Sequence, residues 1–292
     1  MGRNELSSRA QTAIMESIGK KNMETLQAVY RFFWTTGKTP APWGVYHILW
    51  VGIVLACIFL IVRGRKALRR GRLCARLTGA GCAVLFVLEA IKQLMYLFKL
   101  SDGALVVDYT WSVFPFQFCT TPVYVGLAVF FLPEGATKRA FCAFLAAFGL
   151  FGGVTILLYP NAVFTQYEYL NLHTMLWHGG LILIGVLQWA GGTFRTDARD
   201  FLGAAALFLA LVLVALALDL ALPFLADERF NMFYISPYTP CTILFLAKVW
   251  EVAPYPLFFL LYAGGFVLIA FVFFLTGKVL TRQRKSALIP VN

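Results

Sequence analysis

The chain has 292 residues, of which 60% are hydrophobic, 16% aromatic and only 13% charged. Soluble domains carry about 25% charged residues, so this composition excludes a soluble globular domain and predicts an integral membrane protein. The formal net charge is +11, but most basic residues flank the apolar runs, so we expect no nucleic-acid partner.

The first 42 residues are a polar segment in front of the first apolar run. They contain no apolar core of about 7–15 residues, so we predict no cleavable signal peptide. The stretch RAQTAIMESIGKKNMETLQAVYRFFW has rough helical periodicity, which favours an amphipathic helix lying at the membrane interface. A partly disordered tail is the alternative for residues 1–42.

Seven apolar segments follow, each long enough to cross a hydrocarbon core of about 30 Å as a helix of about 20 residues. They are Val45–Val62, Leu77–Phe98, Val113–Leu132, Ala140–Leu158, Thr174–Ala190, Phe201–Leu222 and Pro256–Gly277. We therefore predict an all-α polytopic membrane protein, with a seven-helix domain over residues 43–277 and a basic tail over residues 278–292.

Lysine and arginine are distributed unevenly between the two sets of loops. The first loop, RGRKALRRGRLCAR, carries seven basic residues and the C-terminal tail carries four, whereas the opposite loops hold only Lys99, Arg229 and Lys248. Basic loops stay on the cytoplasmic side. We expect a cytoplasmic C-terminus, an outside N-terminus and a multi-pass protein of the plasma membrane, of the bacterial inner-membrane type.

The stretch from Pro223 to Pro256 is irregular. Its SPYTPCTILFLAKVW segment is too short and too interrupted by proline to span the membrane. We expect an interfacial or re-entrant hairpin on the outer side, where backbone that does not span must be covered by protein or line a cavity.

Polar side chains gather in the outer halves of the predicted spans. Ionisable groups inside a membrane are costly and mark functional sites by default. The spacing i, i+3, i+4, i+7 places four polar residues, Glu89, Lys92, Gln93 and Tyr96, on one face of the second span. We therefore predict a polar cavity open to the outer side, lined by His47, Glu89, Lys92, Gln93, Tyr96, Gln117, Cys119, His173, His178 and Asp219.

Five of these residues also have a purely structural explanation. Glu89 and Lys92 would form an ion pair that only holds helices together. His47 and Asp219 lie near the ends of their spans, where water hydrates them, and His178 would be a hydrogen-bonded structural histidine.

Cys119 and His178 are the minimal parts of a nucleophile–base pair, in which the histidine takes the thiol proton and the thiolate attacks a carbonyl. A thiol in an apolar site is inert without such a partner, so reactivity depends on His178 or His173 coming within hydrogen-bond reach. Gln117 would donate to an oxyanion or to the substrate if a distorted turn brings it into the same pocket.

Metal, cofactor and disulfide chemistry have little support. The six cysteines are scattered without a CxxC pair, and their spacing suits neither zinc nor a disulfide framework. Only Cys119 and Cys241 would meet on an oxidising side. His173 and His178 are five residues apart, on nearly opposite helix faces, so we expect no metal ion and no haem or other cofactor.

Five stretches within residues 43–277 carry a family likeness: WGVYH, LEAIKQLMYL, FPFQFC, LLYPNAVFTQYEYLNLHTMLWHG and FNMFYISPYTPCTILFLAKVWEVAPYPLFF. In these stretches the chain resembles the YwaF-like family of multi-pass membrane proteins. That family includes a eukaryotic transmembrane acyltransferase that acts on ether phospholipids.

The resemblance implies that Cys119 corresponds to the acyl-accepting nucleophile of the family, with His178 as its partner. Asn231 belongs to the family's Asn–Tyr segment before the last span, which makes it a candidate binding residue. The chain departs from the family at Gln117, where histidine is usual, and at Met232, where tyrosine is usual. If that histidine is the essential base of the family, this chain lacks it.

Three functions remain open from the sequence. The first is a membrane lipid acyltransferase that takes an acyl chain from a donor through Cys119. The second is a binding or transport protein for a small solute or lipid headgroup, in which Lys92 and the tyrosines Tyr159, Tyr167 and Tyr169 matter more than Cys119. The third is an assembly partner whose buried ion pairs only hold helices together.

Overall fold

The computed structural model describes residues 21–69, 72–101 and 104–286. Residues 21–33 are helical, as the periodicity of the N-terminal segment predicts. The earlier part of that predicted helix, before residue 21, lies outside the described residues. The last helix continues to Ser286, so the first part of the expected basic tail extends a span instead of leaving it.

Six helical segments of the described chain are long and apolar enough to cross a membrane. They are α2 (Val45–Arg63), α4 (Leu73–Leu97), α6 with α7 (together Ala136–Leu158), α8 (Glu168–Gly191), α9 (Ala198–Ala221) and α11 (Tyr255–Ser286). They confirm a polytopic membrane protein built from α-helices. The orientation relative to the two sides of the membrane stays a prediction.

The third predicted span, Val113–Leu132, is helical over only part of its length. A 3-10 turn, η1 (Trp111–Val113), and irregular backbone precede α5 (Thr121–Phe131), which has 11 residues. Such a helix is about 16 Å long, too short to cross the membrane. Pro115 and Pro122 explain the shortening, because neither can donate a helical hydrogen bond, so a seventh span is not confirmed.

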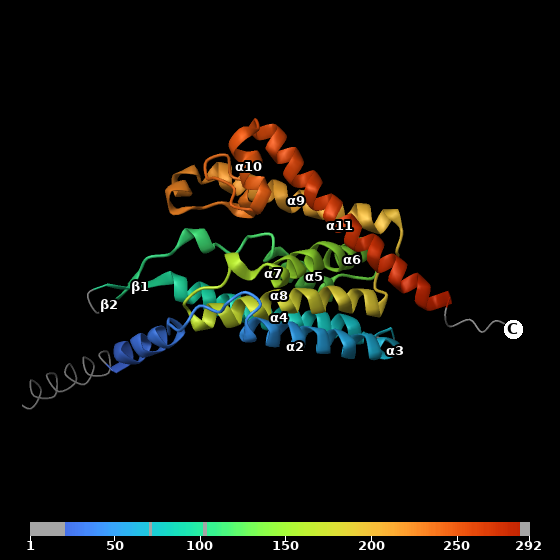
Figure 1. Cartoon of the computed structure of the whole chain (residues 1–292), viewed down its shortest axis with the longest axis horizontal. Coiled ribbons are helices and arrows are strands. Elements are labelled where there is room, and N and C mark those ends of the chain that lie inside the picture. The colour runs from blue at the N-terminus through green and yellow to red at the C-terminus, as the bar shows by residue number, and fades with distance from the viewer. Residues whose placement is uncertain (1–20, 70–71, 102–103, 287–292) are drawn as a thin grey trace, which may run out of the picture.

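The chain folds into packed layers around α8 (Figure 1). Helix α8 contacts α2, α4 and α7, while α4 packs on α5 and α6 packs on α9. Helix α11 crosses this assembly diagonally and reaches the end where α3 (Arg65–Leu68) lies (Figure 1).

A short antiparallel hairpin extends from the end of α4 and is absent from the predicted elements. It consists of β1 (Phe98–Ser101) and β2 (Ala104–Val107), with Phe98 opposite Val107. An ion pair of 2.7 Å joins Lys99 to Asp108 beside it. The hydrophobic run of the second span hides this change, because Phe98 and Leu100 fit a strand as well as a helix.

Helices α6 and α7 join through a buried π-helical turn, η2 (Leu145–Gly149). Beyond it, α7 runs very close to α8. A Cβ atom at Gly153 would lie 2.6 Å from the carbonyl oxygen of His178. Small residues allow this approach, which is how helices pack closely in membranes.

We expect Gly153→Ala to lower the free energy of unfolding by about 1–3 kcal/mol, because the added methyl group overpacks the α7–α8 contact. The control is Gly264→Ala on α11, where an added Cβ would meet nothing within 4 Å and alanine has the better helix propensity. Thermal unfolding in detergent measures both variants. Equal melting temperatures would contradict the close contact.

The stretch after α9 is irregular, as predicted. It contains the 3-10 turns η4 (Pro223–Glu228) and η5 (Met232–Tyr234), and then α10 (Leu244–Val252), which at nine residues cannot span the membrane. Phe233 and Tyr234 have φ angles of 56° and 59°. Such left-handed backbone costs a residue with a side chain about 1–3 kcal/mol, so neighbouring groups must hold this loop in place.

Candidate functional site

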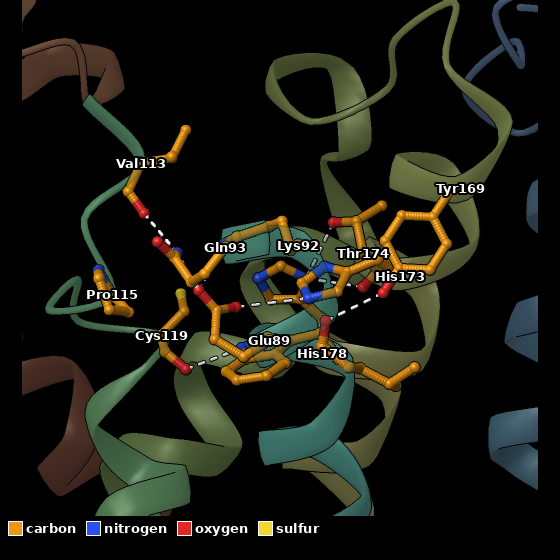
Figure 2. Close-up of polar contacts among 12 residues, drawn as sticks. Glu89, Lys92, Gln93, Val113, Pro115, Cys119, Tyr169, His173, Thr174 and His178 are labelled. Carbon is orange, nitrogen blue, oxygen red and sulfur yellow. Dashed lines mark hydrogen bonds and ion pairs between the residues drawn. The ribbon is translucent and has the colours of Figure 1, made fainter. Parts of the chain in front are cut away.

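The centre of the candidate site is Glu89, which is 3% exposed on the inner face of α4 (Figure 2). Its Oε1 atom lies 2.9 Å from Nζ of Lys92 and accepts a 2.7 Å hydrogen bond from Nε2 of Gln93. These three residues were predicted to share a helix face. The buried carboxylate is compensated by a cation and a hydrogen bond, as a charge in a membrane requires.

Helix α8 supplies the next member of the cluster. Nε2 of His173 lies 3.4 Å from Oε2 of Glu89, yet neither atom has a partner with hydrogen-bond geometry within the described chain. Buried polar atoms are rarely left unpaired in native proteins. Each of the two atoms can therefore form a hydrogen bond with a third polar group.

His178 lies one and a half turns deeper on α8 and is also buried. Its Nδ1 donates to the carbonyl oxygen of Thr174 at 2.8 Å, with the Thr174 hydroxyl 3.1 Å away. A carbonyl oxygen can only accept, so this bond fixes the neutral tautomer with the lone pair on Nε2. The ring is therefore prepared to take a proton at Nε2.

Cys119 lies on the irregular segment before α5, at the edge of this cluster. The Trp177 indole donates to the Cys119 carbonyl oxygen at 2.9 Å and stacks on His173, with ring centroids 5.2 Å apart. In the view of Figure 2, Cys119 projects toward the side of the cluster that holds Gln93. His173 and Trp177 are four residues apart in the sequence and therefore share one face of α8. This spacing could have identified Trp177 as a member of the site.

Cys119 is a partly exposed residue, whereas His173 and His178 are both buried. Within the described chain, no hydrogen bond joins the Cys119 sulfur to His173 or His178. The structure therefore gathers the predicted nucleophile and base in one region without forming the contact that proton transfer needs.

Two further residues complete the cluster and were not predicted from the sequence. Nε2 of Gln93 also donates to the Val113 carbonyl oxygen at 2.8 Å, and the Tyr109 hydroxyl donates to Oε1 of Gln93. Burial, together with the nearby Glu89 carboxylate, raises the pKa of Tyr109 to about 12. Tyr109 is therefore a neutral donor at physiological pH.

Gln117 does not point into this cluster but holds the strained loop. Its Nε2 donates to the Asn231 carbonyl oxygen at 2.9 Å, and its Oε1 accepts from the Phe233 N–H at 2.9 Å. Both ends of the amide are occupied by backbone groups. We therefore assign Gln117 a positioning role in place of the oxyanion donor expected from the sequence.

Asp219 and Asn231 hold the same loop. Oδ1 of Asp219 accepts from the Met232 N–H at 2.8 Å, while Asn231 donates to the Thr239 carbonyl oxygen at 3.0 Å and accepts from the Ser236 N–H at 2.8 Å. Met232, at the position where the resemblance expects tyrosine, is fully buried. These contacts explain how Phe233 keeps its left-handed backbone.

His47 lies apart from the cluster and is fully buried. Its Nδ1 accepts from the Trp43 N–H at 3.0 Å, and its Nε2 donates to the Leu157 carbonyl oxygen at 2.9 Å. Both ring nitrogens are therefore used in joining the start of α2 to the end of α7. His47 therefore has a structural role, which the sequence left open. It is buried and bonded to the backbone, not hydrated as that alternative assumed.

The N-terminal segment covers the cluster at the end of α4 and the start of α8. Trp34 contacts Tyr96 and Tyr167, with ring centroids 5.2 and 4.7 Å apart. A backbone bridge pairs Thr36 with Tyr167, so residues 34–36 pack on α4 and on the start of α8. Tyr96 thus contributes to an aromatic cover that includes this N-terminal segment.

The tyrosines favoured by the binding hypothesis divide between two environments. The Tyr169 hydroxyl donates to the Leu88 carbonyl oxygen at 2.9 Å beside Glu89, and Tyr167 contacts Trp34. Tyr159, at the end of α7, is 47% exposed. Only Tyr167 and Tyr169 therefore border the candidate site.

The described residues bring no three His, Cys, Asp or Glu side chains close enough together to hold a metal ion. All six cysteines are free thiols, so Cys119 and Cys241 are not bridged. The chemistry of the cluster is that of a carboxylate, an ammonium group, two imidazoles and a thiol.

Fold and site together define a polytopic helical membrane protein with a buried ionic cluster near one end of α4 and α8. The chain belongs to the TMEM164 family, whose model matches residues 42–276. No curated protein and no solved structure matches it. As a multi-pass membrane protein, it contacts membrane lipids.

Proposed function

We propose that this TMEM164 family member is a membrane-embedded phospholipid acyltransferase that carries the acyl chain on Cys119. The observation that supports the proposal is that Cys119, a partly exposed residue, borders the ionic cluster: the Trp177 indole donates to the Cys119 carbonyl oxygen and stacks on His173. Four other cysteines are buried, and the remaining partly exposed cysteine, Cys57, lies on α2.

In the proposed reaction, Nε2 of His178 takes the Cys119 proton and the thiolate attacks the ester carbonyl carbon of a donor phospholipid. The carbon–oxygen ester bond breaks, and the lysophospholipid leaves with the proton from His178. A hydroxyl group of the acceptor lipid, deprotonated by His178, then attacks the thioester. The carbon–sulfur bond breaks, and the sulfur regains the proton.

The remaining residues of the cluster would support these steps. The Lys92 ammonium group, held by Glu89, stabilises the negative charge of the thiolate and of the tetrahedral intermediate. The backbone before α5 is irregular, so we expect substrate binding to draw Cys119 toward His178, because catalytic hydrogen bonds often tighten only in the complex. The site would face the outer leaflet of a plasma membrane of the bacterial inner-membrane type.

Acyl labelling of the full chain tests the proposal. In liposomes that contain a phospholipid with an alkyne-tagged acyl chain, wild-type protein is expected to gain a label that hydroxylamine removes, and Cys119→Ser is expected to lose it. Cys57→Ser is the matched control and should keep the label, since Cys57 is the other partly exposed thiol. Equal labelling of the wild type and Cys119→Ser would overturn the proposal.

A second candidate function is binding of a lipid headgroup or small solute without chemistry. The observation that favours it is the unpartnered pair formed by Oε2 of Glu89 and Nε2 of His173, which could hold a hydroxyl group or an ammonium group. Under this function, no hydroxylamine-sensitive label forms on the wild type. Binding of the ligand would then depend on Glu89 and would be the same in Cys119→Ser.

A further inference from the structure

A groove of about 460 Å³ lies at the opposite end of α8 from the ionic cluster. Its walls come from α2 and α11, and Trp189 and Val186 of α8 line it between them. Trp189 lies about 24 Å along the helix from His173. The groove is therefore separate from the candidate active site.

The walls of the groove present almost no free polar groups. The Trp189 indole donates to the Ala146 carbonyl oxygen at 3.0 Å, and the Thr276 hydroxyl donates to the Val272 carbonyl oxygen at 2.9 Å. A Cβ atom at Gly277 would lie 2.3 Å from the Trp189 ring, so α11 and the indole are in direct contact there. The interior suits a hydrocarbon chain, because no polar group has to be left unpaired.

One end of the groove is strongly basic. Arg65 and Arg69 line it, and Nε of Arg69 donates to the Ala190 carbonyl oxygen at 3.2 Å, which holds that side chain beside the groove. The sequence has no acidic residue from position 64 to position 88. Within the part of the chain that the structure describes, neither arginine forms an ion pair.

This arrangement matches one class of molecule. Arginine pairs well with phosphate because its planar fork can donate two parallel hydrogen bonds. A phospholipid has a phosphate for the basic end and hydrocarbon chains for the apolar walls. Two arginines without an ion-pair partner among the described residues favour a lipid with net negative charge. Basic sites next to membrane helices bind acidic headgroups in this way.

We propose that the groove between α2 and α11 binds one anionic phospholipid, with its phosphate on Arg65 and Arg69 and an acyl chain along Trp189. The full chain, purified in mild detergent, is titrated with phosphatidylglycerol or with phosphatidylcholine, and native mass spectrometry counts the bound lipids. We expect one retained phosphatidylglycerol. Arg65→Gln/Arg69→Gln is expected to bind it at least about tenfold more weakly, because hydrogen bonds from arginine to phosphate are charge-assisted and strong.

The control variant, Arg63→Gln/Lys66→Gln, removes the same charge from two exposed residues that do not line the groove. It should retain the lipid. Equal loss in both double variants, or equal retention of phosphatidylcholine, would overturn the proposal.

A second pair of variants tests the apolar part and does not depend on charge. Val272→Trp fills the groove from a position that is 53% exposed, whereas Val279→Trp lies outside it at 51% exposed. We expect only Val272→Trp to lose the bound lipid while keeping a normal melting temperature. Retention of the lipid by Val272→Trp would place the lipid elsewhere on the protein.

Discussion

Replacement of His178 by alanine is expected to slow acylation of Cys119 by about 10²–10⁴-fold, the usual contribution of a positioned general base. The bond from Nδ1 to the Thr174 carbonyl oxygen leaves Nε2 as the atom that accepts the thiol proton. Single-turnover labelling with excess enzyme measures this step without interference from product release. The prediction depends on the proposed acyltransferase function.

His178→Asn separates the chemical role from a structural one. An asparagine side chain has N–H groups for the Thr174 carbonyl oxygen but no nitrogen that takes a proton. We expect this variant to melt like the wild type and to lose acylation as His178→Ala does, with partial recovery in added imidazole. Acylation at the wild-type rate in His178→Asn would exclude His178 as the base.

The largest effect on stability is expected for Glu89→Ala, which should lower the free energy of unfolding by about 3–5 kcal/mol, because removing one member of a buried ion pair leaves its partner uncompensated. The Lys92 ammonium group lies 2.9 Å from Oε1 and its side chain is only 20% exposed. Gln93 also loses an acceptor. Unfolding in a denaturing detergent measures the change.

Glu134→Ala is the matched control for the loss of an ion pair. Glu134 pairs with Lys138 at 2.7 Å, but its side chain is 89% exposed, and exposed pairs contribute about 0–1 kcal/mol. The double variant Glu89→Ala/Lys92→Ala should be less destabilised than the sum of its single variants, since neither charge is then left alone. Additive losses would show that Glu89 and Lys92 are not coupled.

Much of the cluster could be predicted from the sequence because its members lie on regular helices. The spacing of Glu89, Lys92 and Gln93 places them on one helix face. In the structure Glu89 contacts both Lys92 and Gln93. Depth along the helices brought His173 to the same level, and the structure places it 3.4 Å from Glu89. Helical periodicity and span length are local properties, so they can be predicted without knowing which segments pack together.

The role of Gln117 could not be predicted in the same way. A hydropathy window treats Val113–Leu132 as one apolar run, although Pro115 and Pro122 prevent most of its first half from being helical. Once that backbone is irregular, the direction of each side chain depends on neighbours far away in the sequence. Gln117 accordingly contacts Asn231 and Phe233 in the loop after α9.

The sequence by itself determined that this is a helical membrane protein, which face of α4 is polar, and that the first loop of the chain is strongly basic. Only the tertiary structure decided that His47 is a structural histidine, that Trp34 covers the cluster, and that Arg65 and Arg69 border an apolar groove. The physical reason is that composition and periodicity report the local environment of a segment over one or two helical turns. Hydrogen-bond partners and grooves arise where segments distant in the sequence pack together.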